Sequence, residues 1–146
     1  MSKDRASTVR IRRGLYAVVA VSALALGATG AYALFTGTGL RGYTLMAHTS
    51  LGGLFAVTLA LFAVFCGERC RLVAGVPYNA GLRVCFWAFL ALGTVSGLSI
   101  SLCMLPLAGT HGQHVLVAVH RYCGFGIALV ALAHLYFLAL MKKSAS

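Results

Sequence analysis

Residues 115–141 read VLVAVHRYCGFGIALVALAHLYFLALM, and Arg121 is the only charged residue among them. An α-helix needs roughly 20 apolar residues to cross a hydrocarbon core about 30 Å thick. Lipid offers no hydrogen bonds to an irregular backbone, so a segment of this kind crosses as a helix. The stretch is therefore predicted to be a transmembrane helix.

The rest of the chain repeats this pattern. Long gaps between charged residues predict further spans at 15–35, 43–66 and 84–105, beside the one at 115–141. The chain is 60% hydrophobic, with a mean hydropathy of +0.91. A soluble bundle is the alternative, but a soluble domain of 146 residues needs a charged surface. The sequence thus predicts an all-α membrane protein, in which residues 1–146 form a single four-helix domain.

The basic residues predict an orientation. Ten of the twelve lie before the first span, between the second and third, or after the fourth: Lys3, Arg5, Arg10, Arg12, Arg13, Arg69, Arg71, Arg83, Lys142 and Lys143. Basic residues accumulate on the cytoplasmic side, so we expect both termini to be cytoplasmic, in the inner membrane. Topology and attraction to anionic lipid account for the net charge of +10 without nucleic acid.

An internal repeat divides the chain into two halves. Residues 25–30 read ALGATG and residues 91–97 read ALGTVSG, while His48-x-x-x-Gly52 in the second span corresponds to His120-x-x-x-Gly124 in the fourth. The repeat predicts two tandem helical hairpins, an arrangement that often places a site between the halves.

The histidines within the spans are the candidate functional residues, because an ionisable side chain inside a membrane is costly. His48 and His120 should lie at similar depth, where two imidazoles can supply the axial ligands of a haem. Gly52 and Gly124 follow one turn later and would leave space for a porphyrin edge; close helix packing is the other explanation for them. His134 is placed to serve a second centre, or to bond a neighbouring helix.

Together, these features resemble those of a known family of membrane proteins. The four spans, His-x-x-x-Gly in span two, and His120-Arg-Tyr-Cys-Gly124 followed by His134 in span four resemble the b-type cytochrome subunits of membrane-bound formate dehydrogenases and nickel–iron hydrogenases. Small four-helix b-cytochrome-like domains are similar too. The resemblance implies two haems b and electron transfer between a peripheral redox subunit or cytochrome and a quinone.

By this resemblance, His48 and His120 would bind the haem nearer the outer face, and His134 would bind a second haem nearer the cytoplasm. The family takes the other ligand of that second haem from a histidine in span one. Here residues 14–20 read GLYAVVA, with no His, Met or Cys. Three outcomes stay open: a single haem, a ligand from another subunit, or a five-coordinate second haem.

Other polar residues have two interpretations each. Arg121 and Arg41 would pair with haem propionates or extend to the lipid headgroups. His111 and His114, in the connection before the fourth span, would bind quinone or a partner, or be solvated. Cys66 and Cys70 are expected to be reduced thiols at the cytoplasmic face.

Three classes of function are compatible with these residues. The first is a haem-bearing electron-transfer subunit, which would not itself be a catalytic chain. The second is a cofactor-free membrane anchor or assembly protein. The third is a transporter or another redox enzyme, such as a four-helix thiol–quinone oxidoreductase. That enzyme needs a Cys-x-x-Cys-like pair exposed on the outer side, which the sequence lacks. Cys103 and Cys123, toward the outer ends of spans three and four, would approach each other or serve as small apolar filler. No nucleophile–base–acid set for a hydrolase is evident.

Overall fold

Four helices make up the computed structural model, which describes residues 2–67 and 80–144, with side chains except those of 2–9, 12–13 and 141–144. The helices are α1 (Ser2–Thr36), α2 (Gly42–Cys66), α3 (Ala80–Met104) and α4 (Thr110–Ser144). Each includes a segment long and apolar enough to cross a membrane, at residues 14–36, 42–66, 80–104 and 110–140. The prediction of four long apolar helices is confirmed, and the chain is a multi-pass membrane protein by length and hydropathy.

Most of the residues used to predict the orientation lie outside the described side chains. They are Lys3, Arg5, Arg12, Arg13, Arg69, Arg71, Lys142 and Lys143, and the thiol predicted at Cys70 lies outside as well. The orientation across the membrane therefore stays a prediction.

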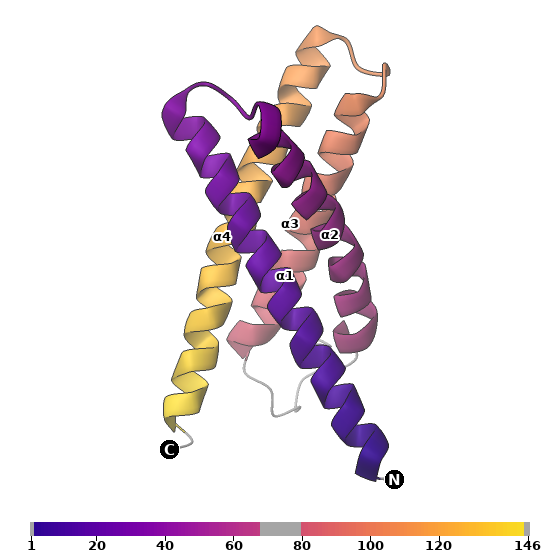
Figure 1. The fold of residues 1–146 in the computed structure, drawn as a ribbon, viewed down its shortest axis with the longest axis vertical. Coiled ribbons are helices and arrows are strands. Elements are labelled where there is room, and N and C mark those ends of the chain that lie inside the picture. The colour runs from indigo at the N-terminus through magenta and orange to yellow at the C-terminus, as the bar shows by residue number, and fades with distance from the viewer. Residues whose placement is uncertain (1, 68–79, 145–146) are drawn as a thin grey trace.

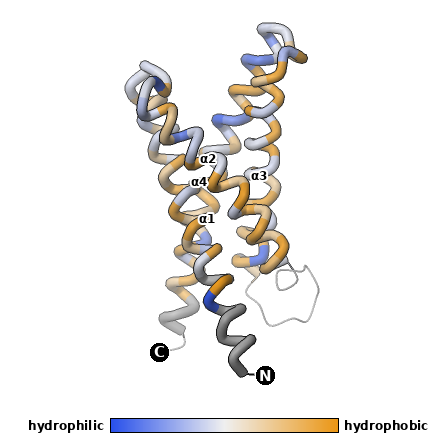
Figure 2. The backbone as a smooth tube through the Cα atoms, turned by 45° about the vertical axis from the view of Figure 1, so that its right-hand side comes forward, coloured by the Kyte–Doolittle hydropathy of each residue, from blue (hydrophilic) through white to orange (hydrophobic). Residues whose placement is uncertain are grey.

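Apolar residues line all four helices, with polar positions sparsely distributed among them (Figure 2). Large apolar side chains are widely exposed on the outside of the bundle, for example Val21, Val57 and Leu129. A helix that is apolar all round is typical of a membrane span, because lipid rather than a protein core covers its outer face.

The helices pack in a definite order. Contacts are most extensive between α3 and α4, then between α1 and α2; α1 also packs on α4, and α2 touches α3 least. Helix α1 begins at the end of the bundle where α4 finishes, and the two short connections lie apart from each other at the opposite end (Figure 1). The first connection contains Gly37 and Gly39, at φ of 65° and 67°, and α2 begins at Gly42, at φ of 52°. Residues with a Cβ rarely adopt this backbone conformation.

The bundle has two unlike halves. We call the half toward the connections the loop half (residues 24–54 and 92–126) and the other the terminal half (residues 14–23, 55–67, 80–91 and 127–140). All the described buried hydrophobic residues lie in the terminal half: Val19, Ala20, Ala23, Phe55, Leu59, Phe62, Leu82, Cys85, Phe86, Phe89, Ile127 and Ala131. In the loop half, the buried described residues are the small Gly93, Ser96 and Ser99.

Aromatic rings form much of the core in the terminal half. The Phe62 ring lies 5.3 Å from that of Phe86 and 6.2 Å from that of Tyr16, measured between centroids. Such tilted pairs at 4.5–7 Å are the favoured geometry for aromatic side chains. These rings join α1, α2 and α3, so the terminal half holds the helices together.

Candidate functional site

Two imidazoles lie close together, one from the helix pair α1–α2 and one from the pair α3–α4. His48 of α2 and His120 of α4 are both half-buried, and their ring centroids lie 6.2 Å apart with an angle of 80° between the ring planes. The structure thus brings together the two residues that the sequence placed at a common depth. Both belong to the loop half, where no buried apolar side chain is described.

The His48 ring is oriented by the helix that precedes it. Thr29 Oγ1 on α1 donates to the carbonyls of Ala25 and Leu26, each at 3.0 Å, and lies 2.7 Å from His48 Nδ1. With its hydrogen used in this way, the hydroxyl can accept from the Nδ1–H of the tautomer that carries its proton there. A neutral imidazole protonated at Nδ1 keeps its lone pair on Nε2, which is then available to a metal.

The His120 ring is oriented in the same manner by α3. Its Nδ1 lies 3.0 Å from Ser96 Oγ and 3.1 Å from the Ser96 carbonyl oxygen. A carbonyl oxygen only accepts, so this Nδ1 carries the proton and Nε2 carries the lone pair. Within the described side chains, these bonds and that of Thr29 are the only hydrogen bonds to the two imidazoles.

Sequence reasoning missed Thr29 and Ser96, although a signal for them was present. Both precede a glycine, in Thr29-Gly30 and Ser96-Gly97, within the two segments that repeat. Each lies on the first helix of its pair and contacts the histidine on the second. A histidine that binds a metal through one nitrogen commonly donates from the other to a fixed acceptor, so a hydroxyl near each candidate ligand was the partner to seek.

The glycines of the bundle fall into two groups. A Cβ built at Gly93 would lie 2.5 Å from Leu59 Cδ2, and one at Gly126 would lie 3.0 Å from Leu92 Cδ1; these glycines serve close packing. At Gly52 and Gly124 a Cβ would meet nothing within 4 Å, although both are half-buried. Helix packing therefore does not explain the two glycines that follow the histidines.

The two imidazoles could supply the axial ligands of a haem, but the described residues do not supply the larger ligand set of a bare metal ion. No group of three or more His, Cys, Asp or Glu that could hold an ion is found among the described residues. A haem needs only axial ligands from the protein, since the porphyrin supplies the other nitrogens. A metal–imidazole bond is about 2.0 Å long and the nitrogen lies about 1.1 Å from the ring centroid, so rings on opposite sides of one ion have centroids about 6 Å apart.

His134 has different surroundings. It is 9% exposed, and its ring lies 4.9 Å from that of Tyr16 on α1, centroid to centroid, at an interplanar angle of 33°. Tyr16 in turn contacts Phe62. One face of the His134 imidazole is therefore covered by an aromatic side chain, in the densely packed half of the bundle.

The remaining candidates lie at the surface of the protein. Arg121, Arg41, His111 and His114 are all exposed. Arg121 follows His120 directly and lies on the same turn of α4, whereas Arg41 precedes α2. The structure does not bring His111 or His114 together with the imidazole pair.

The described cysteines form no disulfide with one another. Cys85 is buried, while Cys66, Cys103 and Cys123 are half-buried. The Cys103 thiol lies 3.9 Å from the Gln113 carbonyl oxygen, which joins the ends of α3 and α4. A redox-active cysteine pair is not evident in this part of the chain.

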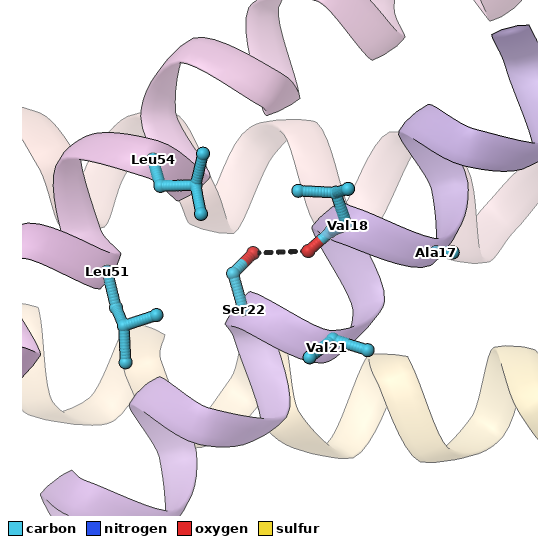
Figure 3. A pocket seen from close by; sticks show the side chains of 6 residues that line it. All are labelled: Ala17, Val18, Val21, Ser22, Leu51 and Leu54. Atoms are coloured by element: carbon cyan, nitrogen blue, oxygen red, sulfur yellow. Dashed lines mark hydrogen bonds between the residues drawn. The ribbon is translucent and has the colours of Figure 1, made fainter.

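A groove of about 350 Å³ lies between α1 and α2 and is separate from the histidines (Figure 3). Its lining is Ala17, Val18, Val21, Ser22, Leu51 and Leu54. The one hydroxyl there, Ser22 Oγ, donates to the Val18 carbonyl at 2.7 Å. No polar group of this lining is left to recognise a polar ligand.

Comparison of the chain with protein-family models, with curated proteins and with solved structures finds no match.

Proposed function

We propose that this chain is a haem b-binding membrane subunit that carries electrons between a quinone and a partner redox subunit. The observation that supports it most is the pair of imidazoles, His48 and His120, whose centroids lie 6.2 Å apart. In the tautomer with the proton on Nδ1, each imidazole donates within its own helix pair and keeps a lone pair on Nε2. Neutral imidazole nitrogen is a common axial ligand of haem iron.

The residues of the site have separate roles in this proposal. His48 and His120 hold the group from two different helices, and Gly52 and Gly124 leave the space that its ring needs. The haem supplies one-electron chemistry, and the protein supplies its ligands and its low-dielectric surroundings. Arg121, the residue after the ligand His120, would pair with a haem propionate.

The orientation of the chain is part of the same proposal. The Thr29–His48 hydrogen bond has a counterpart in the Ser96–His120 hydrogen bond, and this correspondence supports two tandem hairpins. The basic residues support cytoplasmic termini in the inner membrane. The imidazole pair, in the loop half, then lies toward the outer face. A quinone dissolved in the bilayer and a subunit docked on the membrane would reach it from different sides.

The partners follow from the chemistry of a single haem. Such a group holds one electron at a time, so it must receive each electron from one molecule and pass it to another. Quinone and a peripheral redox subunit or cytochrome are assigned to these roles through the resemblance of span four to the b-type cytochrome subunits. The chain itself contributes ligands and position rather than a catalytic group.

We propose one haem for each chain rather than two. In the terminal half, His134 is 9% exposed and its ring lies 4.9 Å from that of Tyr16, so the packed core leaves little room for a porphyrin beside it. His134 instead serves as a core residue that packs α4 on α1. The proposal thus takes the first of the three outcomes left open by the sequence.

The experiment is a reduced-minus-oxidised spectrum of the purified full-length protein, with haem quantified as the pyridine haemochrome. One b-type haem per chain is expected. His48→Ala and His120→Ala should each lower the haem content strongly, since each removes one of the two axial ligands. His114→Ala is the matched control, because it removes an exposed histidine from the same helix as His120.

Two results would count against the proposal. Wild-type protein that is folded but free of haem, after expression with ample haem supply, would reject it. Normal haem content in both His48→Ala and His120→Ala would reject this ligand assignment.

A further inference from the structure

We infer that Thr29 and Ser96 are positioning residues, which fix the tautomer and rotation of the two imidazoles and so set the reduction potential of the bound haem. The inference rests on the proposed function and deepens it. It is carried by the hydrogen bonds between each hydroxyl and an imidazole Nδ1, and by their occurrence at equivalent places in the two repeats.

Thr29 is anchored before it contacts the histidine. Its hydroxyl donates to two carbonyls of the preceding turn of α1, at 3.0 Å each, so the position of Oγ1 is fixed by the helix backbone. His48 Nδ1 then lies 2.7 Å from that oxygen. The imidazole on α2 is thereby oriented by the backbone of α1 through a single side chain.

Ser96 orients His120 through two acceptors rather than one. The side-chain oxygen and the carbonyl oxygen of the same residue lie 3.0 and 3.1 Å from Nδ1. Ser96 is itself 7% exposed, so water has little access to replace its hydroxyl. Loss of the hydroxyl alone leaves the carbonyl in place as an acceptor.

The two ligands are therefore supported unequally. Removing the Thr29 hydroxyl takes away the acceptor described for His48, whereas removing the Ser96 hydroxyl takes away one of two for His120. The repeat makes the two hairpins similar, and the Ser96 carbonyl makes them different. A purely structural role for the hydroxyls predicts no such ranking in the properties of the haem.

The direction of the effect follows from the basicity of the ligand. A hydrogen bond from Nδ1–H to an acceptor makes the imidazole a better electron donor through Nε2, which favours the ferric state. Losing this bond should favour the ferrous state and raise the reduction potential. Outer-shell partners of metal-binding histidines are typically worth 10–100-fold in affinity or activity, and we expect the low end, about tenfold, for Thr29.

The test is a redox titration of full-length variants in detergent, beside their haem content. Thr29→Val should shift the equilibrium toward the reduced haem by about tenfold, which is about 59 mV for a one-electron couple. Ser96→Ala should shift it in the same direction by about threefold. Thr29→Ser keeps the hydroxyl and should restore the wild-type potential.

Matched controls come from hydroxyls that bond the backbone but no imidazole. Thr58 on α2 is 8% exposed and donates to the carbonyls of Leu54 and Phe55. Ser22 on α1 is 2% exposed and donates to those of Val18 and Val19. Thr58→Val and Ser22→Ala should therefore leave the potential unchanged.

The outcomes separate this inference from the function on which it depends. Wild-type potential in Thr29→Val with full haem content would overturn the positioning role and leave the haem site standing. Shifts as large in Thr58→Val as in Thr29→Val would also overturn it, because general packing would then explain both. Absence of haem from the wild-type protein would instead overturn the proposed function.

Discussion

The two halves of the bundle each contain histidine, but in opposite surroundings. In the terminal half, His134 is buried against Tyr16 within a core of aromatic and aliphatic side chains. In the loop half, His48 and His120 are half-buried, contact each other, and are bonded to hydroxyls rather than packed among apolar groups. A role for an intramembrane histidine is therefore better inferred from its neighbours than from its depth.

The glycines of the loop half also differ from one another. Gly93 is pressed against Leu59 and Phe55 where α2 meets α3, whereas Gly52 and Gly124 face open space. One group lets helices approach, and the other leaves room that no side chain of the described residues fills. Tightly packed and open glycines therefore occur side by side within the loop half, as at Gly126 and Gly124.

The largest effect is expected from filling the loop half. Gly52→Leu or Gly124→Leu should remove most of the bound haem, because the new side chain occupies the space beside the ligand. Folding should be retained, since a Cβ at either position meets no atom within 4 Å. Haem content and thermal unfolding of the purified variants measure the two effects.

Gly53→Leu supplies the matched control for these variants. Gly53 is the next residue on α2, is exposed, and also has no neighbour within 4 Å of a built Cβ. Its leucine should point to the surface and leave haem content unchanged. Equal haem content in Gly52→Leu and Gly53→Leu would show that the space beside His48 is not a binding space.

The next effect concerns stability in the terminal half. Phe86 is 1% exposed and contacts both Phe62 and Trp87. Phe86→Ala should lower the free energy of unfolding by about 3 kcal/mol, the low end for a buried phenylalanine. Unfolding in a denaturing detergent measures it, and the folded fraction should still carry one haem per chain. Loss of haem from folded protein would show that the two halves are not independent.

A smaller effect is expected at His134. His134→Phe replaces one flat ring by a somewhat larger one against Tyr16, so the free energy of unfolding should fall by about 1 kcal/mol, the low end for a core residue replaced by a larger one. Haem per chain should equal that of the wild type. A fall from two haems to one between wild type and variant would show that His134 is a ligand after all.

The smallest effect is expected at Arg121. This residue is exposed, and pairs between exposed charges contribute about 0.2–1 kcal/mol. Arg121→Gln removes a positive charge that favours the reduced haem, so the reduction potential should fall slightly. Arg41→Gln, which changes an arginine outside the helices, is the control in the same redox titration. An unchanged potential in Arg121→Gln would assign the guanidinium to the lipid headgroups instead.

Much of the fold could be predicted from the sequence, because crossing a membrane imposes length and apolarity on each segment. Between the predicted spans and the apolar segments of the helices, the largest difference lies at the start of the fourth span, predicted at Val115, whereas the segment begins at Thr110. Residues 110–114 are polar in part and continue the helix beyond the apolar stretch. Composition detects where apolar residues begin, not where helical hydrogen bonding begins.

The site was predictable only in part. Helical spacing and the repeat predicted that His48 and His120 share a depth, and their rings do lie together. The roles of Thr29 and Ser96 could not be derived, because serine and threonine in membrane helices usually bond their own backbone. The stacking of Tyr16 on His134 depends on how α1 crosses α4, which periodicity does not encode.

Ligation of one iron by both His48 and His120 is tested most directly by the electron paramagnetic resonance spectrum of the ferric protein. Two imidazoles on one iron predict a low-spin haem, and ring planes at 80° predict the strongly anisotropic form of that signal. A high-spin signal from a five-coordinate iron, or no haem signal at all, would contradict ligation by this pair.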